Sequence, residues 1–150
     1  MAKKWVGLLI VSLVIVAGGV FLLLRMNTDT SQLRLGDEYY TTQVMRTPEQ
    51  LQKGLSGSDS LPQGQAMLFV FPRDSKWGIW MKDMNYAIDI VWLNSDDEVV
   101  YVVQDAQPSS YPDTTFTPPV DSRYVIELPS GTIERTGITI GDTARMPSGV

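Results

Sequence analysis

The sequence predicts an α+β domain, mainly β, built on a curved or barrel-like, mostly antiparallel sheet with two short helices and preceded by one N-terminal transmembrane helix. Three observations predict this class. Short segments rich in β-forming residues alternate with turn residues, two brief stretches carry helix caps, and residues 5–24 carry no charge. Because the turns between the later strands are short, most neighbouring strands are expected to be antiparallel.

The apolar segment at residues 5–24 reads WVGLLIVSLVIVAGGVFLLL. As a helix it would be about 30 Å long, which matches the hydrocarbon thickness of a bilayer. A cleaved signal peptide is the alternative interpretation, with Ala17-Gly18-Gly19 as a weak cleavage site. Cleavage there would leave an apolar new terminus, so we expect an uncleaved anchor that enters the membrane through residues 5–24.

The charges around this segment set its orientation. Lys3 and Lys4 precede it, and Arg25 alone follows it directly. The positive-inside rule therefore places the N-terminus in the cytoplasm and the rest of the chain outside, as a single-pass protein of the cell membrane with an extracytoplasmic domain. The expected organisation is an anchor in residues 1–25, a polar tether in residues 26–38 and a folded domain in residues 39–146.

The folded part is expected to begin with a strand at residues 39–46, followed by a short helix at residues 47–57. Thr47 and Gln50 form a capping box, and Pro48 fits the first helical position. A second helical turn is expected at residues 129–137, and a long Pro-rich loop at residues 107–120. Further strands are expected at residues 66–71, 77–81 paired as a hairpin with 87–94, 99–106, 122–128 and 138–146.

The composition excludes several classes of site. The chain has no Cys and no His, which removes disulfides, thiolate and imidazole metal sites, and Ser-His-Asp or Cys-His catalysis. Residues 26–150 contain nine Lys+Arg and seventeen Asp+Glu, a formal charge of −8, so no nucleic-acid partner is expected. We expect no metal, no cofactor and no assigned catalytic residue. Whether the protein is an enzyme stays open, and no oligomeric state is indicated.

Five short motifs make the chain resemble the DUF192 (UPF0127) family over about residues 40–145. They are Arg46-Thr47, Gly54-Leu55, Met67-Leu68-Phe69-Val70-Phe71, Trp80-Met81-Lys82 and Ile88-Asp89-Ile90. The resemblance implies a small α+β domain, commonly secreted or tethered, and no agreed activity. The chain departs from the common pattern at three positions, with Ser56 in place of Met, Asp83 in place of Asn and Ala87 in place of Pro.

Asp89 lies within an apolar strand, and the alternation places it on the same face as Val91 and Leu93. A partly buried carboxylate needs partners. One interpretation is structural: Arg46, Lys82 and Asp89 form an ion-pair network, or Asp89 accepts backbone N–H groups in a turn. The other interpretation places these three residues at the floor of a binding cleft. Spacing does not separate the two.

Aromatic residues add to the candidate site. Trp80 and Tyr111 lie beside loops, and with Lys82 and Asp83 they resemble the flat faces and charged groups that hold sugars and other amphipathic ligands. Trp92 and Phe69 are expected in the core instead. The candidate ligand-binding residues are therefore Arg46, Trp80, Lys82, Asp83, Asp89 and Tyr111.

Three functions remain. The leading hypothesis is a membrane-anchored, non-catalytic binding or accessory module of the cell envelope, with a small-molecule or glycan ligand. The second is an envelope enzyme that uses Lys82 with Asp83 or Asp89, since two carboxylates can divide acid and base roles. The third is a structural or protein-docking domain that makes contact through Tyr111 and Phe116 in the Pro-rich loop.

Overall fold

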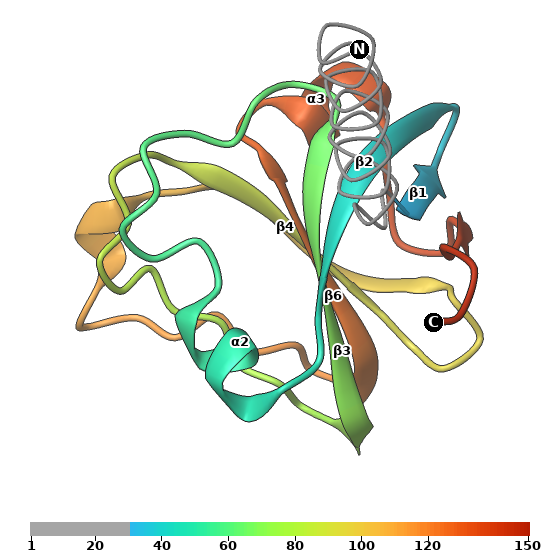
Figure 1. The fold of residues 1–150 in the computed structure, drawn as a ribbon, viewed down its shortest axis with the longest axis horizontal. Coiled ribbons are helices and arrows are strands. Elements are labelled where there is room, and N and C mark those ends of the chain that lie inside the picture. Colours follow the sequence, from blue (N-terminus) through green and yellow to red (C-terminus); the bar gives the residue numbers. More distant parts are fainter. Residues whose placement is uncertain (1–30) are drawn as a thin grey trace, which may run out of the picture. The chain divides into compact units, whose positions relative to one another are not determined.

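The computed structural model describes residues 31–150, which fold around one curled, seven-stranded sheet (Figure 1). The strand order is β5-β4-β6-β3-β2-β1-β7. Two short α-helices and one 3-10 turn complete the domain, so the predicted mainly-β architecture is confirmed. The elements are β1 (Ser31–Leu35), β2 (Glu38–Met45), α2 (Pro48–Lys53), β3 (Gln65–Ser75), β4 (Ile88–Leu93), β5 (Val99–Ala106), η1 (Pro108–Ser110), β6 (Ser122–Pro129), α3 (Thr132–Thr136) and β7 (Ala144–Arg145).

The sheet is antiparallel except between β2 and β3, which run parallel. That parallel pair requires a crossover, and the crossover contains α2. The two edges of the sheet approach each other, because Glu98 at the start of β5 and Thr143 at the start of β7 form an isolated antiparallel bridge. The curvature therefore gives a half-barrel, as the sequence predicts.

Both faces of the central strands are buried, and each face has its own apolar core. Side chains alternate along a strand, so Leu68 and Ile126 belong to one core while Phe69 and Val125 belong to the other. The first core lies against β1 and α3, and the second lies under α2 and the segment between β3 and β4. Continuous apolar runs such as MLFVF in β3 are explained by this double burial.

The two predicted helices are confirmed together with their caps. Thr47 accepts a hydrogen bond from the Gln50 amide, and the Gln50 side chain accepts one from the Thr47 amide, which completes the predicted capping box. α3 ends at Gly137, whose φ of 72° is left-handed. In Figure 1, α2 and α3 lie at opposite ends of the sheet.

Three strand predictions differ from the structure. Residues 31–35, assigned to the tether, form β1, because Leu33 and Leu35 alternate with polar residues and are fully buried. Residues 77–81 form no hairpin with β4, because β5 and β6 already occupy both edges of β4. The last strand, expected at residues 138–146, is reduced to β7, because residues 139–142 turn to hydrogen-bond with Val99.

The predicted anchor and the first part of the tether lie outside the described residues. Among residues 31–150, no helix is long and apolar enough to cross a membrane.

Candidate functional site

The segment between β3 and β4 leaves the sheet and folds over the second core. Trp92 donates its indole N–H to the Trp77 carbonyl at 2.8 Å, and Ile79 exchanges two backbone hydrogen bonds with Phe116. Gly78 fits closely against the 107–120 loop, since a Cβ there would lie 2.6 Å from Thr115 Cγ2. These contacts fix the position of the following residue, Trp80, at the surface.

The turn after α2 is bonded to the same segment. Ser56 Oγ donates to the Lys82 carbonyl at 2.8 Å, and the Gly57 amide donates to the Asp83 carbonyl at 2.8 Å. The Ser58 and Tyr86 hydroxyls lie 2.6 Å apart. The two loops therefore form one bonded unit on the sheet.

A hollow of about 150 Å³ lies between this unit and the sheet. We call it the Glu127 pocket. Its apolar wall comes from α2, β3 and the 78–84 segment, and Gly54 and Gly78 also line it. A second hollow of about 280 Å³ adjoins it, and the two share Gln52, Lys53, Ser56 and Trp80. The apolar lining residues are Leu51, Leu55, Phe69, Phe71, Ile79, Trp80 and Met84.

Glu127 is the acidic residue of the pocket wall. It lies on β6, opposite Met67 of β3 and Ile90 of β4, and its side chain is only 5% exposed. Burial raises the pKa of Glu127 to about 8 from its usual 4.5. Its Oε2 has no hydrogen-bond partner anywhere in residues 31–150. An unpaired buried carboxyl oxygen is costly, so this position is unfavourable for the free protein.

Gly54 covers this oxygen. Its backbone has φ 47° and ψ −132°, which strongly favours glycine. A Cβ at Gly54 would lie 3.1 Å from Phe69 Cζ and 3.9 Å from Glu127 Oε2. The missing side chain therefore keeps open the space between the turn and Glu127.

The family can be decided by comparison with known sequences. The sequence profile of DUF192, described as "Uncharacterized ACR", matches residues 31–146. The chain belongs to the DUF192 family. This confirms the resemblance drawn from the five motifs. No protein with a curated description matches the chain significantly.

Two solved structures share the fold of this DUF192 domain. A protein of unknown function from Novosphingobium aromaticivorans DSM 12444 is 22% identical, with a TM-score of 0.71, and the match covers 76% of this chain and 83% of that one. A putative transcription regulator from Sinorhizobium meliloti 1021 is 24% identical, with a TM-score of 0.73 and coverage of 77% and 92%. At these identities the likeness establishes the fold alone.

Four of the six candidate residues lie together. Trp80, Lys82 and Asp83 line the second hollow, and Tyr111 packs edge-to-face against Trp80 with ring centroids 6.4 Å apart. Trp80 is 43% exposed. The expected core residues Trp92 and Phe69 are both buried, at 0% and 2% exposure.

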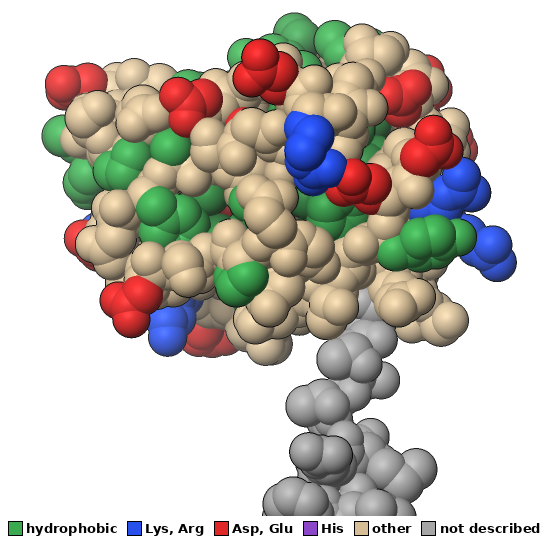
Figure 2. Space-filling model, turned by 90° about the horizontal axis from the view of Figure 1, so that it is seen from above, with side chains coloured by type: hydrophobic (Ala, Val, Ile, Leu, Met, Phe, Trp, Pro, Cys, Tyr) green, Lys and Arg blue, Asp and Glu red, His purple; other side chains and the backbone are tan. Residues whose placement is uncertain are grey.

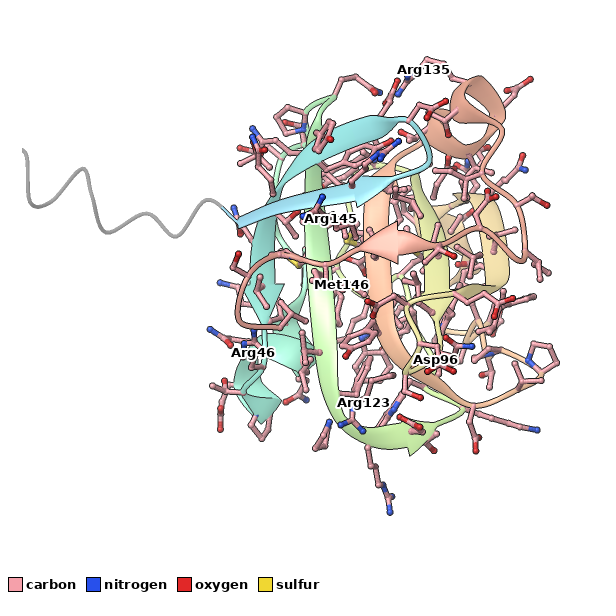
Figure 3. All side chains as sticks on the ribbon, turned by 90° about the vertical axis from the view of Figure 1, so that its right-hand side faces the viewer. Arg46, Asp96, Arg123, Arg135, Arg145 and Met146 are labelled. Carbon is pink, nitrogen blue, oxygen red and sulfur yellow. The ribbon has the colours of Figure 1, made fainter. Side chains whose placement is uncertain are left out.

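Arg46 and Asp89 are not part of this group. Arg46 donates to the Gly149 carbonyl at 2.9 Å and lies at the end of the domain opposite Arg135 (Figure 3). Asp89 accepts the Asp105 amide through Oδ1 and the Ile133 amide through Oδ2, both at 2.8 Å. The ion-pair network of Arg46, Lys82 and Asp89 is therefore wrong. Backbone amides do bond Asp89, as the alternative held, but they come from β5 and α3 and not from a turn.

Two of the three departures from the common DUF192 pattern, Ser56 and Asp83, line the second hollow. Ser56 joins the two loops through its hydroxyl. Asp83 has φ 56°, a left-handed conformation that Asn and Asp tolerate best among residues with a side chain. Asp therefore suits the backbone at this position as Asn would.

Sequence reasoning missed Glu127. The signal was present, because Glu127 interrupts the apolar run of residues 124–129 as Asp89 interrupts its own strand. What the sequence does not contain is the position of α2 and Gly54 above it. Across residues 31–150, no group of three or more acidic side chains is placed to hold a metal ion.

Proposed function

We propose that this protein is a membrane-anchored, extracytoplasmic module that binds a small molecule in the Glu127 pocket. The observation that carries the proposal is the unpartnered Glu127 Oε2 in the wall of a hollow that apolar residues line together with Gln52, Lys53 and Ser56. Binding sites commonly join an apolar lining to a few polar groups, and a costly polar group is typical of a functional position. The anchor is supported by the apolar residues 5–24 and the lysines before them.

The geometry gives each part of the site a role. Phe69, Phe71 and Ile79 surround the apolar body of the ligand, and Glu127 bonds its polar group. Trp80 forms the rim, where its exposed ring and Tyr111 offer flat faces to a ring-shaped or sugar-like portion.

The other two functions receive less support. The enzyme alternative pairs Lys82 with Asp83 or Asp89. Asp89 is a poor acid or base, since both of its oxygens already bond backbone amides, and only Asp83 lines the second hollow with Lys82. A docking surface on the Pro-rich loop conflicts with Phe116, which is half-buried, packs against the second core and bonds to Ile79.

The proposal is tested by nitrogen-15 NMR on the full-length chain in a mild detergent. The probes are benzyl alcohol, benzamide and methyl glucoside, each added to millimolar concentration. We expect shifts at the Gly54 and Ser56 amides and the Trp80 indole. Trp80→Ala should weaken binding several-fold, because the rim is lost.

Tyr39→Ala provides the matched control. Tyr39 is an exposed aromatic on β2, 60% accessible and absent from the pocket wall, so its removal should leave binding unchanged. Probes that shift nothing, or that shift only the 107–120 loop, would disprove the proposal.

A further inference from the structure

The partner that Glu127 lacks can be identified by chemistry. Glu127 lies at the centre of the sheet, with β3 and β4 on either side, and these strands offer no charged side chain to it. Lys53 from α2 lines the same pocket, but no ion pair joins it to Glu127. From the 82–86 segment, the Tyr86 hydroxyl lies 2.6 Å from the Ser58 hydroxyl, and burial together with the Glu127 charge raises the pKa of Tyr86. None of these groups neutralises the carboxyl.

The aromatic walls around Glu127 favour a cation, and the Lys53 ammonium in the same lining opposes one. Phe69, Phe71 and Trp80 line the pocket, and aromatic faces attract cations through their electron-rich centres. The strongest partner for a desolvated carboxylate is a cationic N–H donor, which supplies both charge and hydrogen bonds. A neutral hydroxyl would supply a single hydrogen bond and leave the charge unbalanced.

The net charge of the protein surface also favours a cationic ligand. Residues 26–150 carry a formal charge of −8, and acidic side chains are spread across the face shown in Figure 2. Such a field raises the local concentration of cations and lowers that of anions. An anionic ligand would meet both this field and the carboxylate.

We infer that the Glu127 pocket takes the ammonium or other cationic amine group of a small ligand, with the Glu127 carboxylate as its counter-ion. The inference rests on the binding function proposed above. The Gly54 turn covers Oε2. The terminal torsion angle of a glutamate carboxyl has a broad distribution, so rotation about it can direct either oxygen into the hollow. The apolar body of the ligand then lies along Phe71 and Ile79.

Proton transfer to solvent accompanies this binding. With a pKa of about 8, the Glu127 carboxyl of the free protein is mostly protonated at neutral pH. A bound ammonium favours the carboxylate, lowers that pKa, and so releases the carboxyl proton to the buffer. Affinity for an amine should therefore fall as the pH is lowered from 8 towards 5.

The test compares two probes of nearly equal shape, benzylammonium and benzyl alcohol, on the full-length chain at pH 7.5. We expect benzylammonium to bind at least about tenfold more tightly, and calorimetry in two buffers of different ionisation enthalpy should show release of roughly three quarters of a proton per bound amine at this pH. Glu127→Gln should abolish both the preference and the proton release.

Asp121→Asn is the charge-matched control, because it removes one exposed negative charge outside the pocket wall and should keep the preference. Equal affinity for the two probes would overturn the inference and leave the proposed function standing. An amine preference that survives Glu127→Gln would also overturn it. If neither probe shifts the pocket residues, both the inference and the proposed function fail.

Discussion

Two buried carboxylates on neighbouring strands have opposite environments. Asp89 on β4 pairs with Leu128 of β6, and Glu127 on β6 pairs with Ile90 of β4. Because side chains alternate, the two carboxylates point to opposite faces of the sheet. Asp89 is 1% exposed and has a backbone amide for each oxygen, whereas Glu127 is 5% exposed and its Oε2 has none.

The difference separates a structural carboxylate from one available to a ligand. Asp89 joins β4 to the end of β5 and to the first turn of α3, so it holds three elements together. The Oε2 of Glu127 has no hydrogen-bond partner among residues 31–150, and Glu127 lines a hollow in which Gly54 leaves space beside that oxygen. Both oxygens of Asp89 accept hydrogen bonds, whereas Oε2 of Glu127 accepts none. A buried polar group that the fold leaves without a partner is typical of a functional position.

The largest effect is expected from Asp89→Ala, which leaves the buried Ile133 amide and the partly buried Asp105 amide without an acceptor. We expect the free energy of unfolding to fall by roughly 3–5 kcal/mol, since each orphaned donor costs about 1–3 kcal/mol. Urea denaturation of the full-length chain measures it. Asp89→Asn keeps the shape and one acceptor, and should lose about half as much. An Asp89→Ala protein as stable as the wild type would refute the structural role.

The second effect has the opposite sign. Below pH 4.5, folded and unfolded Glu127 both carry the proton. Between 4.5 and about 8 the unfolded state ionises while the folded state does not, so wild-type stability falls as pH rises. Glu127→Gln has no carboxyl to ionise, so it should be more stable than the wild type by roughly 3 kcal/mol at pH 7.

The pH profile is the decisive part of this measurement. The advantage of Glu127→Gln should vanish near pH 4, grow up to about pH 8 and then stay constant. If the difference in stability between Glu127→Gln and the wild type does not change with pH, burial does not raise the pKa of Glu127 in the free protein.

The smallest effect concerns the glycine above Glu127. Gly54→Ala should destabilise the protein by about 1–3 kcal/mol, because it combines a strained backbone with contact to Phe69. Gly57→Ala is the control, since Gly57 has φ 75° and open space around it, and should cost about 1 kcal/mol from strain alone. Equal losses in the two variants would mean that the space above Glu127 is not tightly bounded.

The sequence predicted those parts of the fold that depend on local chemistry. The capping box of α2, the limits of β5 and the burial of Trp92 are set by neighbouring residues or by plain periodicity, and each is confirmed. The hairpin predicted for residues 77–81 is wrong, because β5 and β6 pair with the two edges of β4. That pairing joins segments far apart in the sequence and cannot be predicted from local residues.

The candidate site divides in the same way. Trp80, Lys82 and Asp83 are close in the sequence and lie together in space. Arg46 was grouped with Asp89 through charge alone, and no local feature indicated that Arg46 would bond Gly149 instead. Glu127 could not be recognised from the sequence, because the pocket around it is formed by α2 and β3. These elements are distant from Glu127 in the sequence and adjacent to it in space.

The bridge between Glu98 and Thr143 also affects the tendency of the protein to self-associate. Exposed strand edges offer unpaired amides that recruit other chains into aggregates. Here the amide of Val99 and the carbonyls of Asp97 and Val99 are bonded to residues 141–144, so the beginning of β5 is covered by its own chain. The contact between the two edges of the curled sheet thus also protects the beginning of β5 from self-association.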